Sequence, residues 1–235
     1  MSITKVPKKY RPKGFDILYE DRDLIIGNKS AGYLTVAALW EKQNTIHEIL
    51  NSYVRKGNAR SNKCVYVIHR LDQATSGVLM FAKTPEVQDF MKDHWKTTVK
   101  TYYAIVHGSL KKKTDKISSY LMEDENYFVS STLDQAKGKL AITEYEVVKE
   151  VEKKSLLKIN LLTGKKNQIR VHLAEMGHSI LGDAKYGKQK NTRHQLMLHS
   201  HRIEFTHPFS QKRMVVVAPV PDYFQREVAF EYETN

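Results

Sequence analysis

The sequence predicts an α+β fold: a mixed, largely antiparallel β-sheet with a few flanking helices. Short runs rich in Val, Ile, Leu, Tyr and Phe recur along the chain, and turn residues separate most of them. Few segments carry apolar residues at helical spacing. No segment repeats at a period of roughly 20 to 50 residues, which argues against a solenoid or a propeller. Strands that follow one another closely can pair as antiparallel neighbours through short connections.

The first elements are a strand pair and a helix. Residues 17–19 and 24–26 are short apolar runs separated by charged residues, which predicts paired strands. Thr45 is suited to begin a helix, because a threonine oxygen at this position accepts a hydrogen bond from an amide of the first turn. The apolar residues that follow it share one helical face: Ile46, Ile49, Leu50 and Tyr53.

The next elements surround a polar turn. Residues 65–68 and 78–81 are strand-like, and the turn 69–77 between them would lie at an edge of the sheet. Thr84 and Pro85 form a cap and first-turn pair for a second helix. Its apolar and aromatic residues repeat at helical spacing: Val87, Phe90, Met91, His94 and Trp95.

The middle of the chain is predicted to be mostly strand. Residues 102–106 form a strand that ends at Gly108. The polar stretch 111–138 indicates an excursion over the surface with one weak hairpin. Alternating apolar and polar residues predict a strand over 142–148, and 156–162 is its expected hairpin partner.

The last elements are a helix and two strands. Residues 167–176 are predicted to be helical because Ile169, Leu173 and Met176 share one face, and Gly177 is suited to end that helix. Strands are expected over 197–205 and 214–217.

Charge indicates a polyanionic partner. The chain of 235 residues has 38 Lys and Arg against 26 Asp and Glu, a formal net charge of +12, which points first to nucleic acid. One cysteine, Cys64, can form neither an internal disulfide nor a thiolate zinc cluster, so the cytoplasm is the expected location. Neither a membrane span nor a signal peptide is predicted.

We expect a basic arm over 1–15, one domain over 16–224 and an acidic tail over 225–235.

The polar turn is the candidate for chemistry. It reads His-Arg-Leu-Asp-Gln-Ala-Thr-Ser-Gly over 69–77, and it presents one carboxylate, Asp72, close to one guanidinium, Arg70. On composition alone this turn is equally compatible with a polar hairpin loop in which both charges are merely solvated.

From about residue 16 to residue 224, the chain resembles the RluA-type pseudouridine synthases. The turn 69–77 resembles the signature in which the aspartate is catalytic. Further segments resemble other motifs of the family in the same order: 100–108, 139–145, 163–173, 177–187, 198–200 and 205–208. The sequence departs from the family at the usual proline of a Lys-Pro-x-Gly motif, where Ser30 follows Lys29, and at Asn167 and Ser179, which replace a histidine and a proline.

The resemblance implies a role for each site residue. It implies Asp72 as the catalytic carboxylate and places Arg170 against it, where a guanidinium would keep the carboxylate ionised. It implies that Tyr102 is also catalytic: it stacks on the target uracil and lies near enough to accept or donate a proton. Arg70 would assist base flipping. Without the resemblance, Tyr102 would be interpreted as a packing residue and Arg70 as a solvated one. The remaining candidate substrate-binding residues are apolar: Leu71, Ile169 and Leu198.

The implied activity is that of an isomerase, an RNA pseudouridine synthase that acts on specific uridines in ribosomal RNA, transfer RNA or both. The alternative is a non-catalytic RNA-binding protein that retains the fold. No S4-type RNA-binding domain is expected before Asp16, so the catalytic domain and the basic arm would hold the RNA. The protein is expected to be a monomer.

No cofactor and no metal are expected for this reaction. Six of the ten histidines follow Arg170, which raises a second alternative, a metal-dependent nuclease. However, no HExxH motif or paired cysteines accompany them, and no Walker loop or GxGxxG motif is present.

Overall fold

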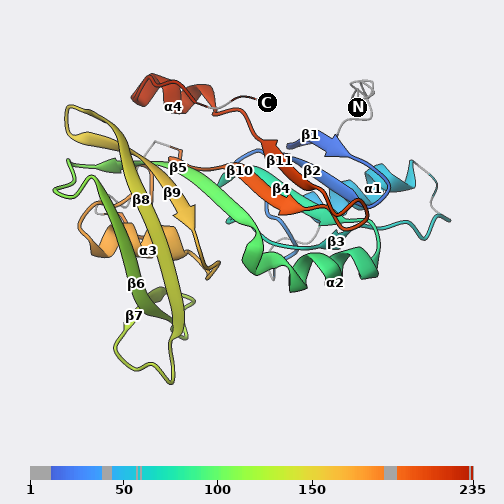
Figure 1. The fold of residues 1–235 in the computed structure, drawn as a ribbon, viewed down its shortest axis with the longest axis horizontal. Helices are drawn as coiled ribbons and strands as arrows, with labels where there is room; N and C mark the ends of the chain where they lie inside the picture. The colour runs from blue at the N-terminus through green and yellow to red at the C-terminus, as the bar shows by residue number, and fades with distance from the viewer. Residues whose placement is uncertain are drawn as a thin grey trace. The chain divides into compact units, whose positions relative to one another are not determined.

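The computed structural model describes residues 12–38, 44–56, 58, 60–187, 195–232 and 234. The chain divides into two compact units. The first contains Met1–Thr98, Ser200–Pro219 and Glu233–Asn235, and the second contains Val99–His199 and Val220–Tyr232. Figure 1 shows the fold, coloured along the chain.

The expected basic arm, 1–15, lies mostly outside the described residues. The bounds expected for the catalytic domain, 16–224, and for the tail, 225–235, stay predictions. Among the described residues, no helix has both the length and the apolar character that crossing a membrane requires.

The first unit is built on antiparallel strands, as the sequence predicts. Its strands are β1 (Phe15–Glu20), β2 (Leu24–Lys29), β3 (Tyr66–Val67), β4 (Ser76–Ala82), β11 (Arg213–Val217) and, from Ser200 on, β10 (Leu198–Thr206). Their order is β1-β2-β4-β10, with β3 paired to β4 and β11 paired to β10. One core cluster is supplied mainly by β2, β4 and β10: Leu24, Ile26, Val78, Met80, Ala82, Ile203 and Phe205.

The helices of the first unit begin at the predicted caps. The side chain of Thr45 accepts a hydrogen bond from the amide of Glu48 at 3.2 Å, and α1 (Ile46–Arg55) follows. Thr84 accepts from the amide of Val87 at 3.3 Å and begins α2 (Pro85–Asp93). The helical spacing predicted to continue to Trp95 ends earlier, because Trp95–Thr97 forms a separate turn of 3₁₀-helix, η2.

The second unit also contains an antiparallel sheet. Its strands follow the order β5 (Val99–His107), β9 (Lys154–Leu161), β8 (Lys139–Val151), β6 (Thr114–Glu123) and β7 (Val129–Thr132). The predicted hairpin of β8 and β9 is confirmed. The helices are α3 (Gln168–Glu175), as predicted, and α4 (Asp222–Glu227), which the sequence analysis missed.

The weak hairpin predicted over 111–138 is present as β6 and β7, but the prediction misses the pairing of β6 with β8. β6 pairs with β7 on one side and with β8 on the other, so its backbone amides and carbonyls contribute to two ladders. Its side chains alternate between exposed and half-buried positions, and Leu121 alone among them is buried. A polar strand held by its backbone lacks the apolar alternation on which the prediction depended.

Candidate functional site

The predicted polar turn carries three of the candidate residues, all in the first unit. Arg70 is exposed, Leu71 is buried and Asp72 is half-buried. The carbonyl of Asp72 accepts a hydrogen bond from the amide of Thr75 at 3.1 Å, which closes the turn immediately before β4. The carboxylate therefore extends from a defined backbone.

The backbone on both sides of Asp72 is tied to the loop that follows β2. The buried Thr35 hydroxyl donates to the carbonyl of Leu71 at 2.9 Å and accepts from the amide of Leu71 at 3.1 Å. The carbonyl of Gln73 accepts from the amide of Gly32 at 2.8 Å, and the Gln73 side chain donates to the carbonyl of Gly32 at 3.0 Å. These contacts fix the residues before and after Asp72. The backbone of Asp72, from which the carboxylate extends, therefore has little freedom to move.

Lys29, at the end of β2, holds the same two loops together. Its side chain is fully buried, and its Nζ donates to the carbonyls of Ser30 at 3.0 Å, Tyr33 at 2.9 Å and Gln73 at 3.1 Å. Burial lowers the pKa of Lys29 to about 7, against the opposing effect of the Asp72 charge. The sequence alone does not indicate this role of Lys29, because its Gln73 partner lies 44 positions further along the chain.

Two further residues fix the turn against β4. His69 Nε2 accepts a hydrogen bond from the amide of Met80 at 3.1 Å, and its ring packs on Trp95 with centroids 4.7 Å apart. Gly77 has a φ of +114°, and a Cβ there would lie 2.1 Å from the carbonyl oxygen of Ser200. A larger residue at position 77 would therefore displace the backbone close to the turn.

Arg170, on α3 in the second unit, forms a bidentate ion pair with Asp183. Arg170 Nε and Nη2 each donate to a carboxylate oxygen of Asp183 at 2.8 Å. The Arg170 side chain is 11% exposed and that of Asp183 is 0% exposed, so the pair is shielded from water. This fork geometry fixes the plane of the guanidinium.

Asp183 also binds the backbone of the loop after α3. One of its oxygens accepts from the amides of Lys185 and Tyr186, both at 3.0 Å. Burial by itself raises the pKa of Asp183, but the bonds and charge of Arg170, with these two amides, hold that pKa below its usual value. Asp183 lies within the segment 177–187 that resembles a family motif, and the sequence alone indicates no role for it.

Two polar side chains attach α3 to the second unit's sheet. Gln168 donates to the carbonyl of Ile142 at 3.0 Å and to the Thr143 hydroxyl at 2.9 Å. The ring of His172, which is fully buried, lies 2.9 Å from the Thr143 hydroxyl and 3.0 Å from the Ser119 hydroxyl. Because these residues are four apart, they share one helical face.

The other predicted residues of the second unit are buried. Tyr102 is 6% exposed and lies in β5 opposite Ile159 of β9. Ile169, on α3, and Leu198, at the start of β10, are also buried. Tyr102 and Arg170 thus belong to the second unit and Asp72 to the first, and their joint action stays a prediction.

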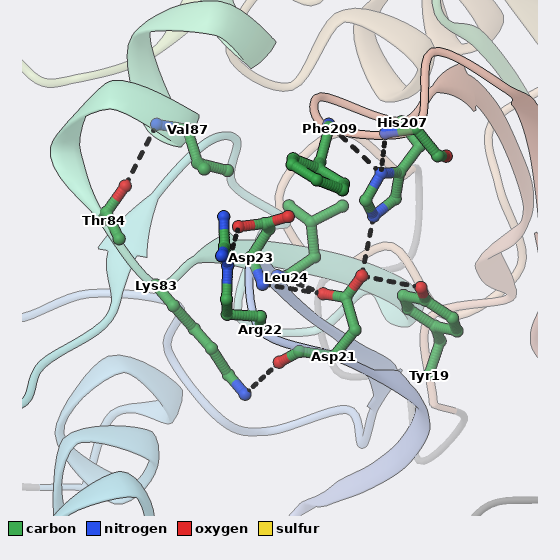
Figure 2. A network of polar contacts seen from close by, with 11 residues as sticks. Tyr19, Asp21, Arg22, Asp23, Leu24, Lys83, Thr84, Val87, His207 and Phe209 are labelled. Atoms are coloured by element: carbon green, nitrogen blue, oxygen red, sulfur yellow. Dashed lines mark hydrogen bonds and ion pairs between the residues drawn. The ribbon is translucent and has the colours of Figure 1, made fainter.

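Figure 2 shows a separate polar group in the first unit. Within the described chain, Asp21, Asp23 and His207 place potential metal ligand atoms within 4.8 Å of one another. Asp21 Oδ1 accepts from the amides of Asp23 at 2.9 Å and Leu24 at 2.7 Å. Its Oδ2 accepts from the hydroxyl of Tyr19 and from His207 Nε2, both at 2.7 Å.

The second ring nitrogen of His207 has protein partners too. Its Nδ1 accepts from the amides of Phe209 at 3.3 Å and Ser210 at 3.1 Å, which places the ring hydrogen on Nε2. Both oxygens of Asp21 and both nitrogens of His207 thus bind protein groups. These contacts join the β1–β2 turn to the β10–β11 turn, which explains why the three side chains lie close together. We assign no metal to the group.

The other late histidines that raised the nuclease alternative have protein contacts where the structure describes them. His178 Nδ1 lies 2.9 Å from the carbonyl of His107, His201 Nδ1 lies 2.9 Å from that of Ala218, and the His199 ring packs on Phe224. His194 lies outside the described residues. The metal-ligand group found in the described chain includes none of these histidines.

Comparison with known proteins gives one family. A family model described as RNA pseudouridylate synthase matches residues 23–175. An RNA pseudouridine synthase of Bacillus subtilis is 33% identical over 210 residues, which cover 88% of this chain and 68% of that protein. The dual-specificity RNA pseudouridine synthase RluA of Vibrio cholerae is 30% identical over 217 residues, which cover 90% of this chain and 85% of that protein.

A solved structure confirms the fold class. The human RNA pseudouridylate synthase domain containing 4 superposes with a TM-score of 0.77 at 20% sequence identity. The match covers 93% of this chain and 95% of that chain. A mixed, largely antiparallel sheet with few helices is therefore shared over nearly the whole length.

Proposed function

The chain belongs to the RNA pseudouridylate synthase family, and from this premise we propose that Asp72 is the catalytic carboxylate with which it isomerises specific uridines. The protein is an RNA pseudouridine synthase, an isomerase. The substrates we propose are ribosomal RNA, transfer RNA or both. The assignment of Asp72 is supported mainly by the fixed backbone of its turn. Leu71 and Gln73, on either side of Asp72, are both hydrogen-bonded to the loop after β2.

The reaction rearranges bonds without changing the composition of the RNA. The bond between N1 of uracil and C1′ of ribose breaks, the uracil turns, and a bond forms between C5 and C1′. The hydrogen on C5 leaves as a proton and N1 gains a proton, so no oxidant or reductant is needed. Asp72 would attack the sugar or the base, or assist departure of the uracil anion; covalent and acid-base routes both need an ionised carboxylate.

Arg170 is the residue we propose to keep Asp72 ionised and oriented. This pairing follows from the family resemblance and from the chemistry of guanidinium and carboxylate. Its support within the second unit is Asp183, whose two oxygens hold Nε and Nη2 of Arg170. A guanidinium fixed in this way loses little entropy when it meets a second carboxylate.

The remaining residues would act on the substrate. Tyr102 is proposed to stack on the target uracil, and Arg70, exposed beside Asp72, to occupy the space that the flipped uridine leaves. The apolar residues Leu71, Ile169 and Leu198 are proposed to contact the base, because apolar surfaces accept the flat faces of a nucleobase. We also propose a monomer that acts in the cytoplasm.

The proposed reaction predicts release of the hydrogen at C5. Purified protein is incubated with RNA transcripts that carry tritium at C5 of their uridines, and tritium in the solvent is measured with and without a chelator. We expect tritium release together with pseudouridine in the digested RNA. Intact RNA without tritium release on any transcript would favour the binding protein, and chelator-sensitive strand cleavage would favour the nuclease.

Lys29 is proposed as a positioning residue that acts through the turn of Asp72. Lys29→Met keeps a long side chain but removes the donor to the carbonyls of Ser30 and Tyr33, and it leaves the carbonyl of Gln73 with only its bond from the amide of Gly32. We expect the turnover number to fall at least about tenfold, because each lost hydrogen bond costs about 0.5–1.5 kcal/mol and the turn loses the donor that joins it to the loop after β2. RNA affinity should stay within a few-fold of wild type. Unchanged turnover in the variant would contradict this role.

The pH dependence of stability gives an independent test of Lys29. Its pKa of about 7 in the folded protein is lower than in the unfolded chain, so the unfolded state binds more protons between about pH 7 and pH 10. Over this range the Lys29 contribution to the free energy of unfolding should rise with pH, by at most about 1.4 kcal/mol per unit. Urea unfolding of wild type and Lys29→Met across this range should show that difference, and parallel curves would contradict it.

A further inference from the structure

The chain between Glu48 and Asp72 contains five lysines and arginines and no acidic residue. They are Arg55, Lys56, Arg60, Lys63 and Arg70, here called the basic segment. Arg55 is half-buried and the other four are exposed. The basic segment lies in the first unit and leads directly into the turn that carries Asp72. The basic segment is hard to recognise in the sequence, because its charges are spread out instead of forming one continuous run.

The basic segment differs from many of the chain's other described lysines and arginines in its lack of ion pairs. Many lysines and arginines elsewhere pair with a carboxylate: Arg22, Lys83, Lys112, Lys113, Lys116, Lys137, Lys154, Lys166, Arg170, Arg202 and Arg213. No member of the basic segment pairs with a carboxylate in the part of the chain that the structure describes. RNA phosphates that contact these charges would release the cations condensed on the RNA, and no ion pair of the protein would have to break.

Hydrogen bonds fold the basic segment back onto the end of α1. Lys56 ends the helix with a φ of 50°, and Arg55 Nε donates to the carbonyl of Lys63 at 3.1 Å. The amide of Val65 then donates to Oδ1 of Asn51, a residue of α1, at 2.9 Å. These contacts place Arg55, Lys56 and Lys63 at the carboxyl end of α1.

The same chain then connects this end of α1 to the proposed catalytic turn. After Lys63 it passes through β3 to Arg70 and Asp72. Arg70 lies seven positions after Lys63, so their Cα atoms are at most about 25 Å apart. A length of RNA backbone of a few nucleotides matches this reach.

We propose that the basic segment binds the sugar-phosphate backbone of the RNA strand that carries the target uridine. Lysine and arginine contacts to phosphate position an RNA without reading its sequence. With Arg70 at one end of the segment, phosphates held by Lys56, Arg60 and Lys63 would set how far along the strand the enzyme flips a uridine. This inference rests on the proposed function and adds to it the surface that holds the flanking RNA.

The test compares two triple variants that remove the same charge. The first is Lys56→Gln, Arg60→Gln, Lys63→Gln, at exposed positions without ion pairs. The control is Lys112→Gln, Lys113→Gln, Lys116→Gln, at positions paired with Asp115, Glu150 and Glu144. Affinity for a fluorescein-labelled RNA hairpin with uridines in its loop is measured over a series of salt concentrations.

The first variant should bind at least about tenfold more weakly at low salt. Its plot of log affinity against log salt should be shallower by about 2 to 3, because each lost phosphate contact removes about 0.7 to 0.9 from the slope. Turnover at saturating RNA should stay within a few-fold of wild type, and the control should retain both affinity and slope.

Equal losses in the two variants would overturn the proposal, because net charge alone would then explain the binding. An unchanged slope in the first variant, or a loss of turnover without a loss of affinity, would overturn it as well. Failure of the proposed function would look different: the wild type would bind RNA but form no pseudouridine. Binding is measured without turnover, so the two failures are distinguishable.

Discussion

Asp72→Asn should abolish pseudouridine formation while the protein still folds and binds RNA. The substitution keeps the shape of the side chain and removes the charge, so the contacts of Thr35 and Gln73 to the neighbouring backbone remain. Without an ionised carboxylate, neither attack on the substrate nor acid-base assistance is available. We expect the turnover number to fall by at least about 10³-fold, measured as pseudouridine in digested RNA.

The matched control is Asp16→Asn, an exposed aspartate on β1 of the same unit. It removes the same charge from the unit and should leave turnover near that of wild type. RNA affinity should stay within a few-fold of wild type in both variants. Comparable turnover of Asp72→Asn and wild type would contradict the proposed role of Asp72.

Asp183→Ala should destabilise the protein more than any surface substitution. The variant leaves the Arg170 guanidinium, 11% exposed, without its bidentate partner, and it removes the acceptor for the amides of Lys185 and Tyr186. Removing one member of a buried ion pair typically costs about 3–5 kcal/mol. Urea unfolding should show a loss of this size. Glu123→Gln, which breaks the exposed ion pair with Lys166, is the control and should have a much smaller effect.

The contribution of Asp183 should also depend on pH in a defined direction. Arg170 and two amides hold the pKa of Asp183 below its usual value, so the folded state keeps this carboxylate ionised to lower pH than the unfolded state does. The stabilisation is therefore complete above about pH 4 and is lost as the pH falls through the folded-state pKa. The stability difference between wild type and Asp183→Asn should shrink on acidification, and a difference that grows would contradict this account.

Local signals in the sequence were sufficient for most of the fold. Helix starts at Thr45 and Thr84 were predictable because a cap acts on an amide three residues away. The hairpin of β8 and β9 was predictable because its residues alternate in burial and its partners are close in sequence. β6 was not, since most of its side chains are polar and its order comes from backbone pairing on both sides.

The candidate site shows the same division between local and distant contacts. The proposed catalytic turn is predictable because its characteristic residues are contiguous. Lys29 and Asp183 lie within segments that resemble family motifs, but their roles are not predictable from the sequence, because tertiary structure determines their partners. Lys29 meets the carbonyl of Gln73 across 44 positions of sequence, and Asp183 meets Arg170 across 13. No local rule relates such positions.

The most direct test of the central claim is a pseudouridine map of RNA treated with purified protein. Total RNA from cells that lack the gene is incubated with wild type or with Asp72→Asn, and pseudouridines are located by carbodiimide-dependent stops of reverse transcription. We predict new stops at specific uridines of ribosomal RNA, transfer RNA or both with wild type, and none with the variant. A map that wild type leaves unchanged, or stops that the variant also produces, would contradict the account.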